Sequence, residues 1–247
     1  MMTEKPKISR EEAKTLTAGS PEHYTSYVGP PAMYDFMGAT QFRLLTTLGL
    51  RETHRLLDFG CGSLRAGRLL IPYLMPGNYY GVEPNAWLIA EAIKHEIGSD
   101  QVLLKKPSFS HNADFEVKNF NVTFDFIVAQ SIFSHAGRDL ITRTLKNFKE
   151  VLAPGGLIAA TFGNVDTRPG ATEFAGSGWV YPGVVDYTPE TVLSLVRNAG
   201  LIGALIPWFH PHNQRWYLMA HMIDRLPSLS KYPHLSGAVL NQMPAST

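Results

Sequence analysis

The chain has 247 residues, of which 45% are hydrophobic, and its 22 basic and 21 acidic side chains give a formal net charge of +1. This length suits one α/β domain with a sizeable core rather than two full domains. The balanced charge lacks the basic excess that binds phosphate backbones, so a nucleic-acid partner is not expected.

Cysteine usage and hydropathy indicate where the protein works. Cys61 is the only cysteine, so no intrachain disulfide can form and a reducing environment is expected. Residues 1–22 are polar and of mixed charge, without the apolar run of a secretory signal. The longest apolar run, residues 69–75, is far shorter than the ~20 residues that cross a bilayer. We therefore expect a cytoplasmic protein without a membrane span.

Short apolar runs alternate with amphipathic stretches from residue 55 onward, which is typical of a parallel sheet covered by crossover helices. The expected strands are residues 55–59, 79–82, 102–104, 124–129, 157–162, 203–208 and 216–222. The expected helices are residues 32–48, 65–75, 86–97, 138–152 and 188–198. Only residues 210–215 separate the last two strands, so these should pair antiparallel.

A glycine-containing loop follows the first expected strand, in the stretch HRLLDFGCGSLRAGRLL from His54 to Leu70. Gly60 and Gly62 let the backbone turn tightly and approach a ligand, while the next helix offers free amides at its N-terminus. The dinucleotide fingerprint GxGxxG would need glycine where Arg65 stands, which weakens a pyrophosphate interpretation. The acid before the glycines, Asp58, instead suits a cationic ligand.

A second acid, Glu83, ends the next expected strand, in YYGVEP, 25 residues after Asp58. In a doubly wound sheet a carboxylate at this place can accept hydrogen bonds from ribose hydroxyls. The alternative is that Glu83 caps the following helix near its positive end. Taken with the glycine loop, this acid favours a nucleoside ligand.

Four motifs carry a family resemblance. LLDFGCG, the acid in GVEP, FDFIVAQ and LAPGGLIAATF resemble, in order and spacing, successive motifs of the class I S-adenosylmethionine-dependent methyltransferases, over roughly residues 56–223. The resemblance implies S-adenosyl-L-methionine as cofactor and a Rossmann-like α/β fold: a seven-stranded, mostly parallel sheet with an antiparallel last strand and helices on both faces. It also implies a flexible arm over 1–22, a helical cap over 23–50, the methyltransferase domain over 51–225 and a tail over 226–247.

The resemblance assigns cofactor contacts residue by residue. The amino-acid end of the cofactor falls to the glycine loop, the ribose to Glu83 and the adenine to Asp114 and Phe115, although Asp114 could equally be a solvated turn residue. Arg65 stands at a helix start, where a cation is disfavoured, so it is expected to bind the cofactor carboxylate or to pair with a nearby acid. The expected cofactor contacts are Asp58, Gly60, Cys61, Gly62, Arg65, Glu83, Asp114, Phe115 and Gln130. Leu64 stands where many members have a third glycine.

The segment AQSIFSHAGRD, residues 129–139, faces the transferred methyl group in this family. His135 can take a proton from a hydroxyl or amine nucleophile. The alternative is a packing residue at a helix start, because transfer to a good nucleophile needs alignment more than a base. The candidates for lining the reaction centre are Gln130, Ser131, Phe133, Ser134 and His135.

Other candidate substrate contacts lie in loops at the same end of the sheet. Trp179 and Tyr181 could stack on the substrate or on the sulfonium, with Tyr181 a second catalytic candidate, or they could only close the loop. Tyr34 in the cap and His210 in the last hairpin complete the expected substrate contacts. His210 and His212 have no convincing third ligand nearby, so no metal site is expected.

The expected activity is methyl transfer to an oxygen or nitrogen of a small molecule by in-line displacement at the sulfonium. Alignment alone can supply ~7 to 11 kcal/mol in favourable cases, so no metal or covalent residue is required. Two alternatives stay open: attack by the cofactor's own amino group with loss of methylthioadenosine, and cofactor binding without catalysis. The expected partner is a small-molecule substrate, and a homodimer is left open.

Overall fold

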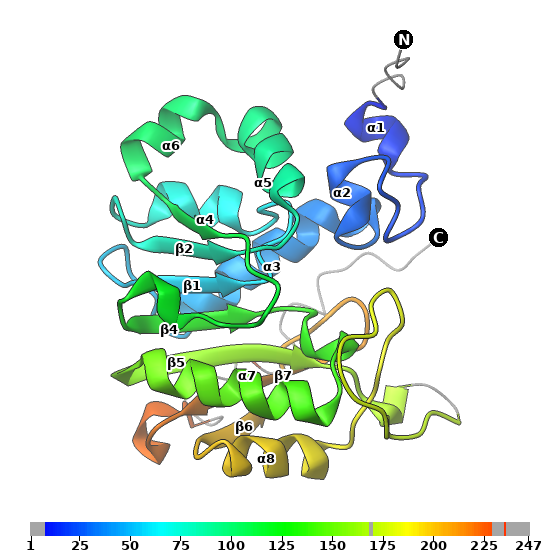
Figure 1. Cartoon of the computed structure of the whole chain (residues 1–247), viewed down its shortest axis with the longest axis vertical. Coiled ribbons are helices and arrows are strands. Elements are labelled where there is room, and N and C mark those ends of the chain that lie inside the picture. Colours follow the sequence, from blue (N-terminus) through cyan, green and yellow to red (C-terminus); the bar gives the residue numbers. More distant parts are fainter. Residues whose placement is uncertain (1–7, 168–169, 229–234, 236–247) are drawn as a thin grey trace.

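The computed structural model describes residues 8–167, 170–228 and 235, and its strands form one seven-stranded sheet (Figure 1). The strand order is β3-β2-β1-β4-β5-β7-β6, and β7 alone runs antiparallel to its neighbours. The strands are β1 (Leu56–Phe59), β2 (Tyr79–Val82), β3 (Ser108–Ser110), β4 (Phe124–Ala129), β5 (Leu152–Phe162), β6 (Ile202–Ile206) and β7 (Arg215–Ala220). This confirms the predicted Rossmann-like sheet and its antiparallel last hairpin.

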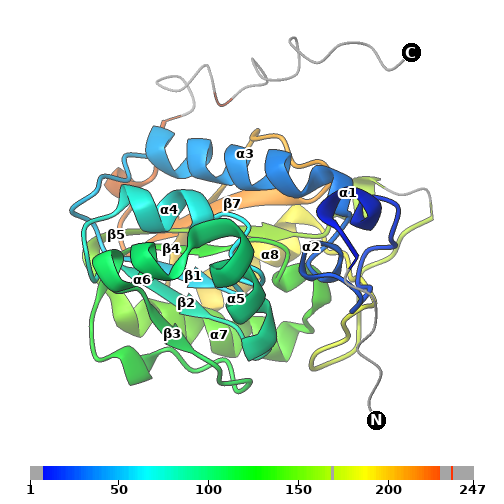
Figure 2. The same ribbon diagram turned by 90° about the horizontal axis from the view of Figure 1, so that it is seen from above.

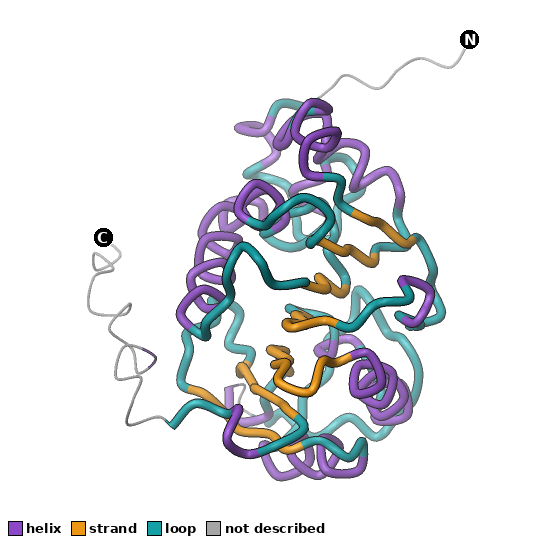
Figure 3. The backbone as a smooth tube through the Cα atoms, turned by 90° about the vertical axis from the view of Figure 1, so that its left-hand side faces the viewer, coloured by secondary structure: helices purple, strands orange, loops and turns teal. Residues whose placement is uncertain are grey.

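Helices cover both faces of the sheet, as Figures 2 and 3 show. Core residues of α7 and α8 pack on one face, and those of α3, α4 and α5 pack on the other. The helices are α1 (Arg10–Ala13), α2 (Tyr24–Tyr27), α3 (Tyr34–Thr47), α4 (Gly67–Tyr73), α5 (Ala86–Ala92), α6 (Ser99–Lys105), α7 (Arg138–Val151) and α8 (Pro189–Asn198). Thr188 caps α8 by accepting a hydrogen bond from the backbone N–H of Thr191, as its residue type predicts.

The central strands are buried on both faces, which explains why they read as continuous apolar runs. In β1, Leu57 packs into the core under α7 and α8, and Leu56 packs into the opposite core. In β4, Ile127 and Val128 divide in the same way. Because successive side chains of a strand point to opposite faces of the sheet, each central strand contributes residues to both cores.

One predicted strand is wrong. Residues 102–104 lie within α6, and the third strand is Ser108–Ser110. Leu103 and Leu104 are 77% and 61% exposed, so their apolar side chains indicate neither a buried core position nor a strand. A run of three apolar residues does not distinguish a short helix from a strand.

Two helix boundaries also differ from the prediction. The helix expected over 86–97 divides into α5 and a π-helical turn, Ile93–Ile97, whose bond runs from the backbone N–H of Gly98 to the carbonyl of Ile93. The helix expected from residue 65 begins at Gly67, because residues 61–66 form turns of the glycine loop. Periodicity alone does not resolve such ends.

The described part of the predicted arm contains α1, which begins with a capping box between Ser9 and Glu12. Residues 1–7, and most of the predicted tail over 226–247, lie outside the described residues. Leu235 is described and is buried in the core beneath α3 and α4. The division of the chain into arm, cap, domain and tail stays a prediction.

Gly38 lets α3 lie directly against the glycine loop. A Cβ at this position would stand 2.4 Å from the backbone carbonyl oxygen of Arg65.

Replacing a helical glycine by alanine normally stabilises a helix by about 1 kcal/mol. Here we expect Gly38→Ala to lower the free energy of unfolding instead, by about 1–3 kcal/mol from overpacking, as measured by urea unfolding. The exposed neighbour Ala39 supplies the control: Ala39→Gly should cost about 1 kcal/mol from helix propensity alone. A stabilised Gly38→Ala protein would contradict the close approach.

Candidate active site

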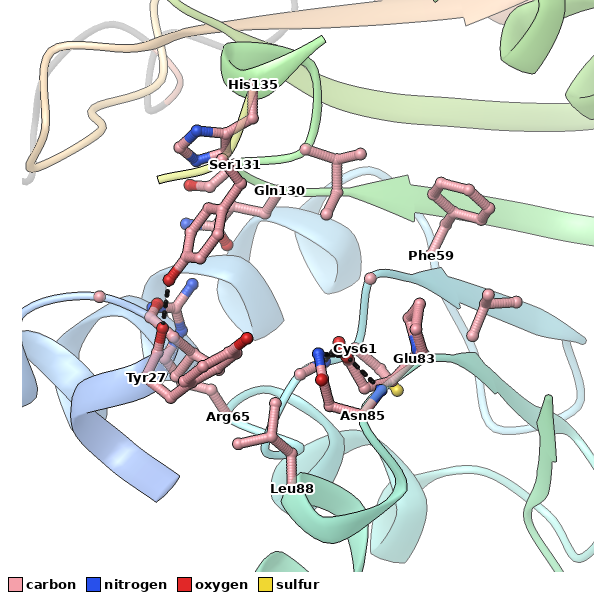
Figure 4. A pocket seen from close by; sticks show the side chains of 18 of the residues that line it. Tyr27, Phe59, Cys61, Arg65, Glu83, Asn85, Leu88, Gln130, Ser131 and His135 are labelled. Carbon is pink, nitrogen blue, oxygen red and sulfur yellow. Dashed lines mark hydrogen bonds between the residues drawn. The ribbon is translucent and has the colours of Figure 1, made fainter. Parts of the chain in front are cut away.

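A cavity of about 620 Å³ lies at the carboxyl ends of β1, β2 and β4 (Figure 4). Its walls come from residues 18–30, the glycine loop after β1, the ends of β2 and β4, and the loop over residues 179–184. The strand order reverses between β1 and β4, and open α/β sheets bind ligands at such a switch point. The volume is in the range of small-molecule sites.

The glycine loop makes three left-handed turns in five residues. Gly60, Gly62 and Leu64 have φ values of 75°, 53° and 54°. A non-glycine residue in this conformation costs about 1–2 kcal/mol. The side chain of Leu64 is fully buried in the core with α3 and α4, and this burial offsets the cost. The loop therefore keeps a glycine-like course at the position where the sequence lacks a third glycine.

Glu83 joins the end of β2 to the glycine loop. Its Oε2 accepts a hydrogen bond of 3.2 Å from the backbone N–H of Gly62. Its Oε1 accepts from the backbone N–H and the side-chain amide of Asn85, at 2.9 and 2.8 Å. Asn85 is the N-cap residue of α5, so Glu83 does support the helix start. The carboxylate also lines the cavity, where Oε2, which accepts a single hydrogen bond, retains capacity to accept from a ligand hydroxyl.

Asp58 is a buried carboxyl group in the cavity wall. The hydroxyl of Tyr79 donates to its Oδ2 at 2.8 Å. Burial raises the pKa of Asp58 to about 6, although the Tyr79 hydrogen bond and the charge of Arg65 oppose the rise. A cationic ligand group beside this carboxyl would favour its ionised form.

Arg65 presents a half-buried guanidinium to the cavity. Its Nη1 donates to the carbonyl of Val28 at 3.0 Å, and its buried Nε has no hydrogen-bond partner. Burial lowers the pKa of Arg65, and Tyr34 and Asp58 only partly oppose this. No carboxylate of the described chain forms an ion pair with Arg65, so pairing with a protein acid does not explain it. An isolated buried charge is costly, and a bound anion would offset that cost.

Ser131 and His135 lie on the wall opposite Arg65, after β4 (Figure 4). The Nδ1 of His135 is 2.6 Å from the carbonyl oxygen of Gly183. A carbonyl only accepts, so Nδ1 carries the proton and Nε2 holds the free electron pair. Burial lowers the pKa of His135, which keeps the ring neutral near pH 7. The side chain can therefore act as a proton acceptor.

Aromatic rings surround His135. The ring centroids of Trp179 and Tyr181 lie 5.6 and 5.0 Å from that of His135. The hydroxyl of Tyr181 donates to the backbone carbonyl of Tyr27 at 2.8 Å, so the loop over residues 179–184 is tied to the N-terminal wall. Asp58, Arg65 and Glu83 are the charged side chains among the described residues that line the cavity, and all three come from the β1–β2 side.

Residues 57–158 match the model of the family described as "Methyltransferase domain". Over these residues the chain is similar to a methyltransferase domain, in agreement with the predicted resemblance to the class I S-adenosylmethionine-dependent methyltransferases. Its fold is similar to that of the magnesium protoporphyrin IX methyltransferase from Synechocystis PCC 6803, with a TM-score of 0.57, 11% identity, and 78% of this chain and 81% of that one covered.

Two further solved methyltransferases share the fold. An S-adenosylmethionine-dependent methyltransferase from Clostridium acetobutylicum ATCC 824 gives a TM-score of 0.57 at 14% identity, covering 76% of this chain and 91% of that one. The sugar N-methyltransferase KedS8 from Streptoalloteichus sp ATCC 53650 gives 0.54 at 14% identity, covering 76% and 87%. At these identities the likeness concerns the fold.

The structure brings most of the predicted site residues to the cavity. The predicted residues that line it are Asp58, Gly60, Cys61, Gly62, Arg65, Glu83, Phe115, Gln130, Ser131, His135, Trp179 and Tyr181. Their individual roles stay predictions. They nevertheless converge from five separate chain segments on one cavity.

Five predicted residues are not part of the cavity wall. Ser134 is buried, and its hydroxyl oxygen accepts a hydrogen bond of 3.3 Å from the side-chain amide of Gln214. Tyr34 is buried, and its hydroxyl donates to the carbonyl of Ser63. Phe133 is buried in the core, stacked on Phe162. Both are large apolar rings, and packing decides their position.

The other two are polar residues turned away from the cavity. Asp114 is exposed and accepts from the backbone N–H of Glu116, which is the turn role considered for it. His210 is 3% exposed and lies behind Gln130, with its Nε2 at 3.2 Å from the Gln130 amide nitrogen. Burial lowers the pKa of His210 to about 3.

Several wall residues were missed from the sequence. Asn112 lines the cavity near Phe115, and its buried Oδ1 has no hydrogen-bond partner. The misplaced third strand concealed it, since a strand ending at residue 110 would have pointed to residues 111–113. His212 also lines the cavity, and no periodic or spacing signal singles it out. The expected cap and the last hairpin, which were predicted to border the site, contribute Tyr27 and Gln214.

Two structural findings bear on other classes of protein. Among the described residues, no three histidine, cysteine or acidic side chains form a group that could hold a metal ion. The described helices include none with the length and apolar character needed to cross a membrane.

The buried carboxyl of Asp58 predicts a pH dependence of stability. Its pKa is raised from the ordinary value of 3.8 to about 6, so between these values the folded protein binds more protons than the unfolded chain. The free energy of unfolding therefore falls as pH rises from about 4 to about 7, by about 3 kcal/mol from this group. Asp58→Asn keeps an acceptor for Tyr79 but cannot ionise. In urea unfolding across this range we expect the variant to lack that fall, and identical pH profiles would contradict the assignment.

Proposed function

We propose that the cavity binds S-adenosylmethionine and that the protein transfers the methyl group to a hydroxyl oxygen of a small, uncharged, flat acceptor. The observation that carries the proposal is the half-buried guanidinium of Arg65, whose enclosed Nε has no hydrogen-bond partner. It has no carboxylate partner among the described residues and faces a cavity that also presents Glu83. A ligand with an anionic group at one end and ribose hydroxyls further along matches both groups.

The residues present fit this cofactor. Arg65 would hold its carboxylate, and Asp58 would accept from its ammonium group. Glu83 would accept from the ribose hydroxyls, and the amide of Asn112 together with the ring of Phe115 would hold the adenine. When bound, the cofactor supplies a methyl group on a positively charged sulfur.

The wall after β4 supports a hydroxyl as acceptor. A hydroxyl must lose its proton as its oxygen bonds to the methyl carbon and the carbon–sulfur bond breaks, whereas a neutral amine can attack with its own electron pair. The Nε2 of His135 is available to take that proton, because Nδ1 is held by Gly183. The sugar N-methyltransferase that shares the fold shows that the fold alone does not favour oxygen.

The acceptor wall supports an uncharged, flat molecule. Tyr27, Trp179 and Tyr181 line this part of the cavity, and aromatic faces pack well against planar groups. None of the charged lining side chains described above comes from this wall. A charged acceptor would therefore lose its hydration without gaining a partner.

Cofactor binding can be tested by calorimetric titration with S-adenosylhomocysteine. We expect the wild-type protein to bind it, and Arg65→Gln and Glu83→Gln to weaken binding at least tenfold, or about 1.4 kcal/mol. Arg65→Lys serves if the glutamine variant does not fold, since it keeps the charge but loses the planar fork. Arg197→Gln, on the exposed face of α8, is the matched control and should bind normally. A folded wild-type protein that ignores the ligand at millimolar concentration would overturn the proposal.

The role of His135 can be tested by mass spectrometry of products formed from S-adenosylmethionine and hydroxylated aromatic acceptors. We expect His135→Asn to slow methylation by about 10²–10⁴-fold. Wild-type turnover should fall with acid only below the ordinary histidine range, because the pKa is lowered, and the variant should lack this limb. The same pH profile in both proteins would make His135 a packing residue. Methylthioadenosine formed without any acceptor would indicate the intramolecular reaction instead.

A further inference from the structure

Glu96 lies outside the cavity, on the π-helical turn Ile93–Ile97 that follows α5. Its side chain is only 5% exposed and holds three donors: the hydroxyl of Tyr24 at 2.8 Å, Nη1 of Arg10 at 3.0 Å and Nη1 of Arg68 at 3.2 Å. Burying a carboxylate is costly unless its partners are well placed. π-turns often occur at functional sites, so the role of this one needs an explanation beyond packing.

Two of the three donors come from the N-terminal segment, which we define as residues 9–30. It contains only two helices of four residues each, α1 and α2, and both lie beside the core domain (Figure 2). Its apolar anchor is small, a cluster of Tyr24 with Tyr34 and Leu88. Glu96 therefore holds this segment through two residues, beside the Arg10–Asp35 ion pair and the stacking of Tyr24 on His95.

The N-terminal segment is also a wall of the cavity, through residues 18–19 and 27–30. The carbonyl of Val28 accepts the hydrogen bond from Arg65. The Cγ1 of Val28 stands so close to Gly62 that a Cβ on that glycine would be 2.7 Å away. The position of the segment thus fixes both the guanidinium and the glycine loop.

A second connection runs through α4. Arg68, held by Glu96, lies with its Cζ 5.2 Å from the ring centroid of Tyr34. Arg10 lies at the same distance from the same ring, and the Tyr34 hydroxyl donates to the carbonyl of Ser63 in the glycine loop at 2.7 Å. The carboxylate of Glu96 is therefore connected to the glycine loop by two series of contacts, one through the N-terminal segment and one through Arg68 and Tyr34.

We propose that Glu96 is a positioning residue for the cofactor: it holds the N-terminal segment so that Val28 orients Arg65 and closes the glycine loop. This rests on the proposed function, because Arg65 is taken there as the group that holds the cofactor carboxylate. Glu96 itself touches neither cofactor nor acceptor.

The test compares Glu96→Gln with Glu91→Gln, its control on α5. Glu91 is 43% exposed and pairs only with His95 among the described residues, at 3.4 Å. Glu96→Gln keeps the shape and an acceptor for Tyr24 but removes the buried one of the two carboxylates that pair with both arginines, the other being the exposed Asp35. We expect its dissociation constant for S-adenosylhomocysteine to rise at least fivefold, mainly through faster dissociation, and its amide hydrogen exchange to increase within residues 9–30. Glu91→Gln should match the wild type in both measurements.

A double-mutant cycle separates positioning from general destabilisation. If Glu96 acts through Arg65, then Glu96→Gln should add little to the loss already caused by Arg65→Gln. Full additivity, or unchanged affinity in Glu96→Gln, would overturn the proposal. Failure of the wild-type protein to bind S-adenosylhomocysteine would instead refute the proposed function. In that case unchanged exchange over residues 9–30 in Glu96→Gln would refute the docking role of Glu96 as well.

Discussion

The structure depends on one electrostatic constraint: charged groups are held away from water at the carboxyl ends of the central strands. Asp58 is buried there and Arg65 is half-buried, with its Nε enclosed, and each is only partly satisfied by the protein. Removing an ion from water costs several kcal/mol after relaxation. The fold bears this cost where β1 and β4 diverge, at the place where an open α/β sheet can admit a ligand. The same desolvation strengthens any interaction that the two groups make with a bound molecule.

The glycine loop is the backbone counterpart of this constraint. It must pass close to a ligand and also pack against α3, where Gly38 leaves room for the carbonyl of Arg65. Leu64 takes a left-handed conformation that most side chains avoid, and its complete burial compensates. Local propensity and tertiary packing therefore conflict at the site and agree in the strands. Such conflicts are expected where function sets the geometry.

The sequence predicted the sheet and the cavity better than the orientation of single side chains. β2 and β4 were predicted with their observed bounds, because long apolar runs between turn residues leave little choice. The third strand was wrong because residues 102–104 are apolar without being buried. Glu83 was found from its place at a strand end, which backbone topology fixes.

The sequence did not predict which way side chains point in turns, where a shift of one residue moves a side chain from the core to the cavity. Phe133 and His135 are two residues apart, yet a 3-10 turn, Phe133–His135, sends one into the core and leaves the other on the cavity wall. His210 and His212 differ in the same way. No hydrophobic period covers such turns. The particular contacts of the N-terminal segment could not be predicted either, since those with Glu96 and Tyr181 span 86 and 154 residues.

Hydrogen bonds to two adjacent residues, Tyr27 and Val28, link the acceptor wall of the cavity to the cofactor wall. This link affects how the acceptor site is completed. Tyr181, on the acceptor side, donates to the carbonyl of Tyr27, and the next residue, Val28, accepts from Arg65 on the cofactor side. A ligand that orders Arg65 therefore also orders the peptide on which the acceptor loop rests. The aromatic wall needs this support because Trp179 is 45% exposed and gains little from its own burial. Water exclusion at the reacting atoms thus depends on a segment that contributes no reacting group.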